Sequence, residues 1–517
     1  MATNVSSIKS PAKPAVQPVE EDSFQIGVSR PPLDVSDLPT PEEVFKVPKL
    51  GRAEVWKFVL GPSMIALGAS IGSGEWLLGP LAFGKYGFIG IGWLITIAAI
   101  LQTFFNMEVA RFTMATGEVP SVAFSRTPPG KAFWVPFTLF MIFMGWIWGG
   151  WASTAGQSLF ALFTGRPNTP EELQIVRLIA IGLMIGSLTL FLFGKKVSQT
   201  LETFNTWAVW FVLLFVIAVT VAIVPVSYWG ASLASAVIPA RIPAGMDATL
   251  LGGIIGYTGF AAGFNFMLIN YYRDKGYGMG HKVGFISGLV GGEKQDVRAV
   301  GVTFRDTPQN QSLWNRWWRY LAMDQWGIFF IGAILGMFIP SILVAWLAQM
   351  PGAAVPERAN MPIYAATELG RNYGNWLFVL TLIVGTFTLF KTQATILEMV
   401  IRNTADSAYA MFPSLHEWTK GDVRKFYYPV AILIIVLIGI IIHLALPTTL
   451  LLISSNMANL AGVIFPLVMI YLNLRLPKTA RAKWWSIVAL VIFALFSAFF
   501  FANFVSVNLF KVPLITF

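Results

Sequence analysis

Apolar stretches of about 20 or more residues alternate with short polar segments along most of this 517-residue chain. A helix needs about 20 apolar residues to cross the hydrocarbon core of a bilayer. Eleven stretches meet this requirement, so the pattern predicts an all-α membrane protein with eleven transmembrane helices. The stretches span residues 56–84, 87–116, 132–163, 176–194, 203–225, 247–271, 325–349, 374–400, 427–446, 447–473 and 484–508.

The composition agrees with a membrane location. Hydrophobic residues make up 56% of the chain and charged residues only 12%, whereas a soluble domain carries about 25% charged residues. The chain contains no cysteine, which excludes disulfides, thiol chemistry and thiolate metal sites. Residues 1–50 are rich in Pro, Ser and acidic residues and lack the apolar run of a signal peptide, so they are predicted to form a disordered cytoplasmic tail.

The distribution of basic residues predicts the orientation of the spans. Lys and Arg favour the cytoplasmic loops of membrane proteins. With the N-terminus inside, 28 of the 36 Lys and Arg residues fall in cytoplasmic segments, and one more, Lys391, lies inside the eighth span. We therefore expect a multi-pass protein of the cell (inner) membrane with a cytoplasmic N-terminus and an outside C-terminus.

Two of the predicted spans contain an interruption near the middle. In the first span the sequence Gly72-Ser73-Gly74-Glu75 places two glycines, a serine and an acid where hydrocarbon is expected. In the sixth span, residues 259–263 (GFAAG) are mostly small, and the polar Asn265 follows them. Interrupted helices at corresponding positions of two five-helix halves indicate an inverted-repeat transporter. The predicted halves are 51–225 and 226–473, followed by an eleventh helix and C-terminus in 474–517.

Five short motifs between residues 55 and 480 support this reading. They are Gly61-Pro62 nine residues before the first break, Arg111 with Thr116-Gly117 at the end of span two, Leu201-Glu202 after the basic pair Lys195-Lys196, Met323-Asp324, and Phe465-Pro466-Leu467. In this combination the chain resembles the Nramp (natural-resistance-associated macrophage protein) transporters. The resemblance implies a LeuT-like 5+5 inverted repeat with broken helices 1 and 6, and a family activity of proton-coupled divalent-metal transport.

The chain departs from that family at the positions that bind the metal. The family has Asp-Pro-Gly-Asn in the first break and Met-Pro-His in the second, and its Asp, Asn and Met hold the metal. Here the first motif falls on Gly72 to Glu75, and the second on Ala262, Gly263 and Phe264. Mn²⁺ and Fe²⁺ need carboxylate, imidazole or thioether ligands, and Glu75 alone remains. We therefore expect a divergent member that does not carry transition metals.

A small anion such as bicarbonate is the first substrate hypothesis. Helix ends exposed at a break present N–H groups and a positive dipole to an anion. Lys391 is a candidate for binding because an intramembrane cation is usually functional, although its side chain could instead snorkel towards the cytoplasm. The expected substrate-binding residues are Gly72, Ser73, Gly74, Glu75, Thr258, Ala262, Gly263, Phe264, Asn265 and Lys391, with Tyr257, Tyr271 and Tyr272 as further polar contacts.

A hydrated divalent cation such as Mg²⁺ is the second hypothesis. Mg²⁺ keeps several waters and needs only one or two carboxylates, so Glu75 would be the main ligand, aided by Asn265 and by carbonyls freed at the breaks. Glu75 has other possible roles: a buried carboxyl could shuttle a coupling proton, or the acid could cap the second half-helix. A sensor that binds a ligand without transporting it also remains open.

Other classes of protein fit the sequence less well. No set of residues for nucleophilic or metal-dependent catalysis converges on one region, so an enzyme is not expected. A passive channel would not require paired interruptions in the two halves. We expect no cofactor, no bound structural metal and no nucleic-acid partner. The expected partners are a small ion, the lipid bilayer and, as a coupling ion, the proton.

Overall fold

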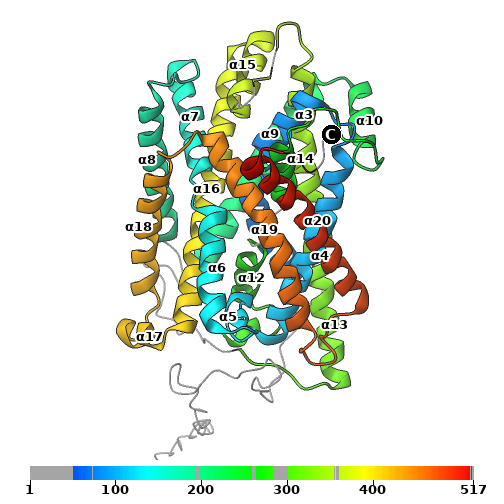
Figure 1. Cartoon of the computed structure of the whole chain (residues 1–517), viewed down its shortest axis with the longest axis vertical. Helices are drawn as coiled ribbons and strands as arrows, with labels where there is room; N and C mark the ends of the chain where they lie inside the picture. The colour runs from blue at the N-terminus through cyan, green and yellow to red at the C-terminus, as the bar shows by residue number, and fades with distance from the viewer. Residues whose placement is uncertain are drawn as a thin grey trace, which may run out of the picture.

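The computed structural model describes residues 51–72, 74–192, 197–258, 264–283, 301–353, 355–356, 360–512 and 514. Figure 1 shows a bundle of long helices whose connecting segments gather at its two ends. The tail 1–50 and three expected site residues, Ser73, Ala262 and Gly263, lie outside the described residues. The backbone of Phe264 is described, but its side chain is not.

Nine helical segments within the described ranges are long and apolar enough to cross a membrane. The chain is therefore a multi-pass membrane protein. The segments are α4 (Gly92–Thr116), α6 (Lys131–Trp146) with α7 (Gly150–Thr164), α8 (Leu173–Leu192), α9 (Val197–Ile223), α13 (Pro308–Ala322) with η4 (Met323–Phe330) and α14 (Ile331–Leu347), α16 (Asn375–Met411), α18 (Arg424–Ile441), α19 (Pro447–Asn473), and α20 (Trp484–Val505) with η5 (Ser506–Phe510).

The first predicted span is broken where its sequence predicts a break. It consists of α2 (Pro62–Ser70), the π-helical turn η2 (Gly74–Leu78) and α3 (Gly79–Tyr86). The last main-chain bond of α2 runs from the Ile71 N–H to the Leu67 carbonyl oxygen, at 2.8 Å. All described residues from Pro62 to Phe83 are buried, so the backbone freed at this break is surrounded by protein rather than lipid, as the bilayer requires.

The sixth span is also divided, into α11 (Ala248–Tyr257) and α12 (Phe264–Lys275). The Asp247 side chain caps the start of α11 by accepting bonds from the backbone N–H groups of Thr249 and Leu250, at 2.8 and 3.1 Å. The helix ends at Thr258, whose backbone is extended (φ −61°, ψ 120°). Both predicted interruptions are therefore present.

A third interruption differs from the prediction of one continuous helix over 132–163. Helix α6 ends at Trp146 and α7 begins at Gly150, because Gly149 adopts a left-handed conformation with φ +66°. The hydropathy of the segment is continuous across this point, and a glycine inside an apolar helix is usually tolerated. The apolar pattern alone therefore carried no signal for this break.

The short helices separate into two groups at opposite ends of the bundle (Figure 1). The segments predicted to be cytoplasmic, α5 (Pro120–Phe124), α13 and α17 (Pro413–Thr419), lie at one end. The segments predicted to be outside, α10 (Val226–Ala234) and α15 (Met361–Tyr373), lie at the other. This arrangement agrees with the predicted alternation of the loops, while the compartment that each end faces remains a prediction from charge.

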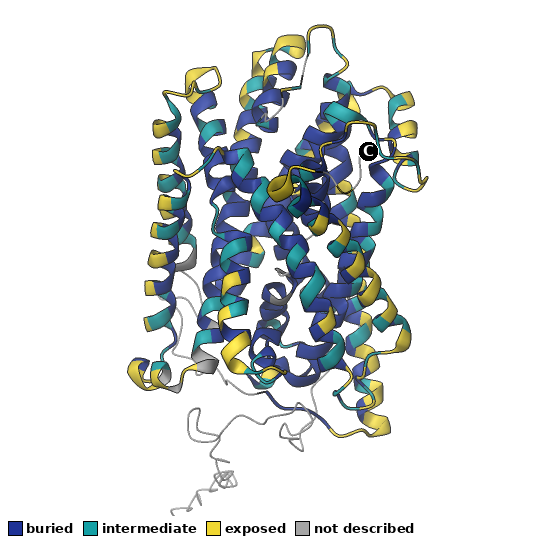
Figure 2. Ribbon diagram, viewed as in Figure 1, coloured by how far each residue is buried: buried dark blue, intermediate teal, exposed yellow. Residues whose placement is uncertain are grey.

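The outer helices present apolar side chains to the surroundings, and the central ones are buried. Figure 2 shows exposed positions along α8, α18 and α20 and a buried interior between them. The exposed side chains include Leu178, Ile185, Ile432, Leu433 and Leu495. In water such a surface would be an aggregation hazard, whereas in a bilayer it contacts lipid. The broken helices lie in the buried interior.

We predict that the break tolerates no side chain at residue 72. A Cβ at Gly72 would overlap the Thr392 hydroxyl, whereas a Cβ at the exposed Gly182 of α8 would meet no atom within 4 Å. Gly72→Ala should therefore destabilise the protein by roughly 1–3 kcal/mol, the usual cost of overpacking. Thermal unfolding in detergent measures the effect, with Gly182→Ala as the matched control. Equal melting temperatures for the two variants would contradict the close approach.

Candidate functional site

The side chain of Lys391 occupies the break in the first span. Lys391 lies in the middle of α16, is fully buried, and donates from Nζ to the carbonyl oxygens of Gly68 and Ile71 at 2.7 and 2.6 Å. These carbonyls belong to the C-terminal end of α2, where backbone acceptors lose their helical partners and the helix dipole is negative. The alternative that Lys391 snorkels to the cytoplasm is therefore wrong.

Thr392 places a hydroxyl at the same end of α2. Its Oγ1 donates to the Gly68 carbonyl oxygen at 3.2 Å and lies 3.5 Å from the Ile71 carbonyl oxygen. Gly72 allows this close approach, because its missing side chain would collide with Thr392. The end of α2 is thus held by two consecutive residues of α16.

Gly74 provides a second close approach, to the end of α11. A Cβ at Gly74 would lie 2.9 Å from the Tyr257 carbonyl oxygen. The two broken helices therefore meet directly, with Gly74 beside Tyr257. The Thr258 hydroxyl donates to the Ile254 carbonyl oxygen of its own helix at 2.8 Å. Its only donor hydrogen is therefore used, and its oxygen could only accept a hydrogen bond from a ligand.

Glu75 lies in the first turn of η2 and is fully buried. Its Cγ would be 3.4 Å from a Cβ at Gly336, so its side chain packs towards α14. It is also close enough to Lys391 for an electrostatic interaction. The break therefore contains one positive and one negative side chain, contributed by two different helices.

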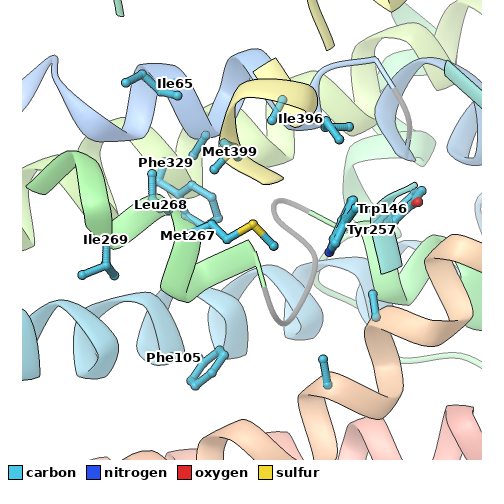
Figure 3. Close-up of a cluster of buried hydrophobic side chains, with 14 of the residues drawn as sticks. Ile65, Phe105, Trp146, Tyr257, Met267, Leu268, Ile269, Phe329, Ile396 and Met399 are labelled. Atoms are coloured by element: carbon cyan, nitrogen blue, oxygen red, sulfur yellow. The ribbon is translucent and has the colours of Figure 1, made fainter. Parts of the chain in front are cut away.

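Aromatic side chains form a wall beside this break. Trp146 and Trp151 flank the third interruption, and their rings lie 5.7 and 5.8 Å from that of Tyr257. Figure 3 shows the rings of Trp146 and Tyr257 facing each other. The Tyr257 hydroxyl donates to Ser454 of α19 at 2.5 Å, and Ser454 donates to the Gly145 carbonyl oxygen. The unpredicted break in the third span thus positions part of the site.

Asn265 belongs to a carboxamide cluster that the sequence analysis missed. Its Nδ2 donates to Gln102 at 3.0 Å and also to Asn106, both on α4. All three side chains are buried. Gln102 and Asn106 are polar residues four positions apart inside an apolar span, which places them on one helix face. This spacing is the sequence feature that could have predicted the cluster. Asn265 therefore ties α12 to α4.

Tyr271 and Tyr272, expected as further polar contacts, instead bond to buried carboxylates at the predicted cytoplasmic end. Tyr271 donates to Glu398 of α16, and Tyr272 donates to Asp324 of η4. The next residues of α12 continue the pattern: Asp274 pairs with Arg402 at 2.6 Å, and Lys275 pairs with Glu202 of α9 at 2.7 Å. We call residues 271–275 the α12 clamp, because they tie α12 to three other helical elements.

We predict that Arg402 is essential for the stability of this clamp. Arg402 is fully buried between Glu398 and Asp274, with bonds of 2.7 and 2.6 Å. Arg273 still pairs with Asp274 at 3.0 Å, so Arg402→Met mainly leaves the buried Glu398 without the cation that pairs with it, at a cost of about 3–5 kcal/mol.

The matched control is Arg166→Met, which breaks the solvent-exposed pair with Glu172. Exposed pairs contribute little to stability, so this variant should unfold like the wild type. Unfolding of the two variants in detergent measures the contrast, and similar melting temperatures would rule out the clamp as a major source of stability.

Comparisons with known proteins bear on the fold alone. No protein-family model and no curated sequence matches the chain. Among solved structures, a variant of the manganese transporter from Eremococcus coleocola superposes with a TM-score of 0.59 at 13% identity, covering 93% of each chain. MhsT in complex with L-phenylalanine superposes with a TM-score of 0.52 at 15% identity, covering 89% of this chain and 99% of MhsT. The chain therefore has the LeuT fold.

Proposed function

We propose that the protein is a secondary transporter for a small anion, such as bicarbonate, which binds at the junction of the two broken helices. The observation that carries the proposal is the fixed ammonium of Lys391 at the end of α2. A positive charge held in a buried site repels a metal cation and attracts an anion. The LeuT fold supports transport, because its broken helices surround a substrate site near the middle of the membrane.

The ligands at the junction also support an anion over a transition metal. Within the described ranges, no three His, Cys, Asp or Glu residues lie close enough to hold a metal ion. The junction residues outside those ranges, Ser73 and 259–263, are Ser, Gly, Phe and Ala by sequence, and none of these types supplies a carboxylate, imidazole or sulfur ligand. Glu75 is then the only acid at the junction, and Lys391 offsets its charge.

In this proposal the amide groups of the first break and the Ser73 hydroxyl donate to the anion. Gly72 and Gly74 leave the backbone accessible, and η2 begins at Gly74, so the positive end of a helical segment faces the break. Glu75 sits in the first turn of η2, where the dipole stabilises a carboxylate. A proton on Glu75 would remove its repulsion of the anion, which gives a physical route to proton-coupled uptake.

Mg²⁺ transport is the second candidate, favoured by the buried carboxylate of Glu75. A partly hydrated Mg²⁺ would use Glu75 and main-chain carbonyls. Lys391 weighs against it, because its ammonium already binds two of the freed carbonyls. The neighbouring manganese transporter has the same fold, but at 13% identity this likeness does not transfer its substrate.

We predict that proteoliposomes containing the protein will show protein-dependent, saturable bicarbonate transport. Internal pH, read by a trapped dye, should change with an imposed bicarbonate gradient faster than in empty vesicles. Mn²⁺, followed by a metal-sensitive dye in the same vesicles, should not accumulate. Saturable Mn²⁺ uptake would contradict the proposal, and Mg²⁺ flux without a bicarbonate response would favour the second candidate. Ligand binding without any flux would indicate a sensor.

We also predict distinct effects for the two charged residues. Lys391→Met removes the charge but keeps the length of the side chain, so the anion loses the attraction of a buried positive charge. Bicarbonate transport at low substrate should therefore fall by about tenfold or more. Ser73→Ala should have a smaller effect of the same kind. Glu75→Gln should retain transport and flatten its dependence on pH. If all three variants transport like the wild type, the site lies elsewhere.

A further inference from the structure

The surroundings of the Lys391 ammonium consist of oxygen atoms. The Gly68 and Ile71 carbonyl oxygens lie at 2.7 and 2.6 Å, and Thr392 Oγ1 lies at 3.5 Å. The carboxylate of Glu75 adds a negative charge nearby. Lys391, Thr392, Ile71 and Glu75 are all fully buried. Carbonyls, a hydroxyl and a carboxylate are the ligands that hard metal cations take in proteins.

The position of these oxygens, like their chemistry, suits a bound cation. The carbonyls at the end of an unwound half-helix are where alkali cations bind in broken-helix transporters. The negative end of the α2 dipole adds to their attraction for a positive charge. An empty cage of this kind would leave acceptors unsatisfied in a buried site, which is costly. Something cationic has to fill it, and here the chain does so itself.

We propose that these oxygens form a monovalent-cation site that the protein fills with its own lysine. The Lys391 ammonium is a tethered substitute for a soluble ion such as Na⁺. Because it is covalently attached, its local concentration far exceeds that of any ion in solution, and its charge cannot leave when the site opens. The wild-type protein therefore neither needs nor binds Na⁺ at this break, whichever substrate it carries.

Removing the lysine should reopen the site to a free cation. We expect full-length Lys391→Ala, purified in detergent without substrate, to be stabilised by Na⁺ or methylammonium but not by choline at equal ionic strength. The melting temperature, read from tryptophan fluorescence, should rise saturably by roughly 2–4 °C. The wild type should show no difference among the three cations.

Two further variants separate a cation site from a general salt effect. Lys391→Met fills the space with an apolar chain and should not respond to Na⁺. Lys391→Ala combined with Thr392→Val removes one oxygen of the cage and should need a several-fold higher Na⁺ concentration for the same shift. Both are compared with Lys391→Ala in the same buffers.

Each outcome of these experiments either supports or contradicts the proposal. Recovery of a poorly folding Lys391→Ala by Na⁺ or methylammonium, but not by choline, supports it. A cation-specific shift in the wild type would overturn it, because the site would then not be filled by lysine. No response of Lys391→Ala to either cation, or failure of both cations to recover it, overturns it as well. Since no substrate is present, these outcomes are independent of whether the protein transports an anion.

Discussion

The bond between the Lys391 ammonium and the end of α2 is the interaction on which the centre of this structure depends. A helix interrupted inside a membrane exposes carbonyl groups that water cannot reach, and each costs several kcal/mol if it stays unsatisfied. A buried ammonium is costly for the same reason. In this protein the two groups satisfy each other, at 2.6 and 2.7 Å. The break in the first span therefore requires α16 to lie against α2.

The neighbouring residues follow from that requirement. Gly72 has no side chain because Thr392 lies against it, and Gly74 has none because the end of α11 does. Glu75 is close enough to the ammonium to offset its charge. Three helices distant in sequence thus converge on Gly72, Gly74 and Glu75. The aromatic wall of Trp146, Trp151 and Tyr257 stands beside them.

The sequence predicted the fold well because the membrane restricts the choices. Hydropathy located the spans, and small or polar residues within two of them located the first and sixth breaks. The break after Trp146 was missed because it depends on the backbone conformation of Gly149, which leaves the hydropathy unchanged. Lys391 was identified as unusual, but its partners lie more than 300 positions away in the chain, and a single sequence holds no signal for such a pairing. Tyr271 and Tyr272 were expected near the substrate, yet buried carboxylates, which hydropathy cannot locate, hold them at the end of α12.

The two basic residues of α16, Lys391 and Arg402, have different consequences for motion. Lys391 lies at the break, and its bonds hold α16 to α2 near the middle of the span. Arg402, three helical turns further along α16, holds α12 through Asp274 at the predicted cytoplasmic end. If the bundle opens towards that end, water reaches Arg402 and Asp274 and replaces their lost pairing, so the cost of separation falls as the opening widens. No such compensation reaches Lys391 while the break stays buried. Opening is therefore expected to separate the clamp first and to pivot about the lysine, which would keep its charge beside the proposed substrate site throughout.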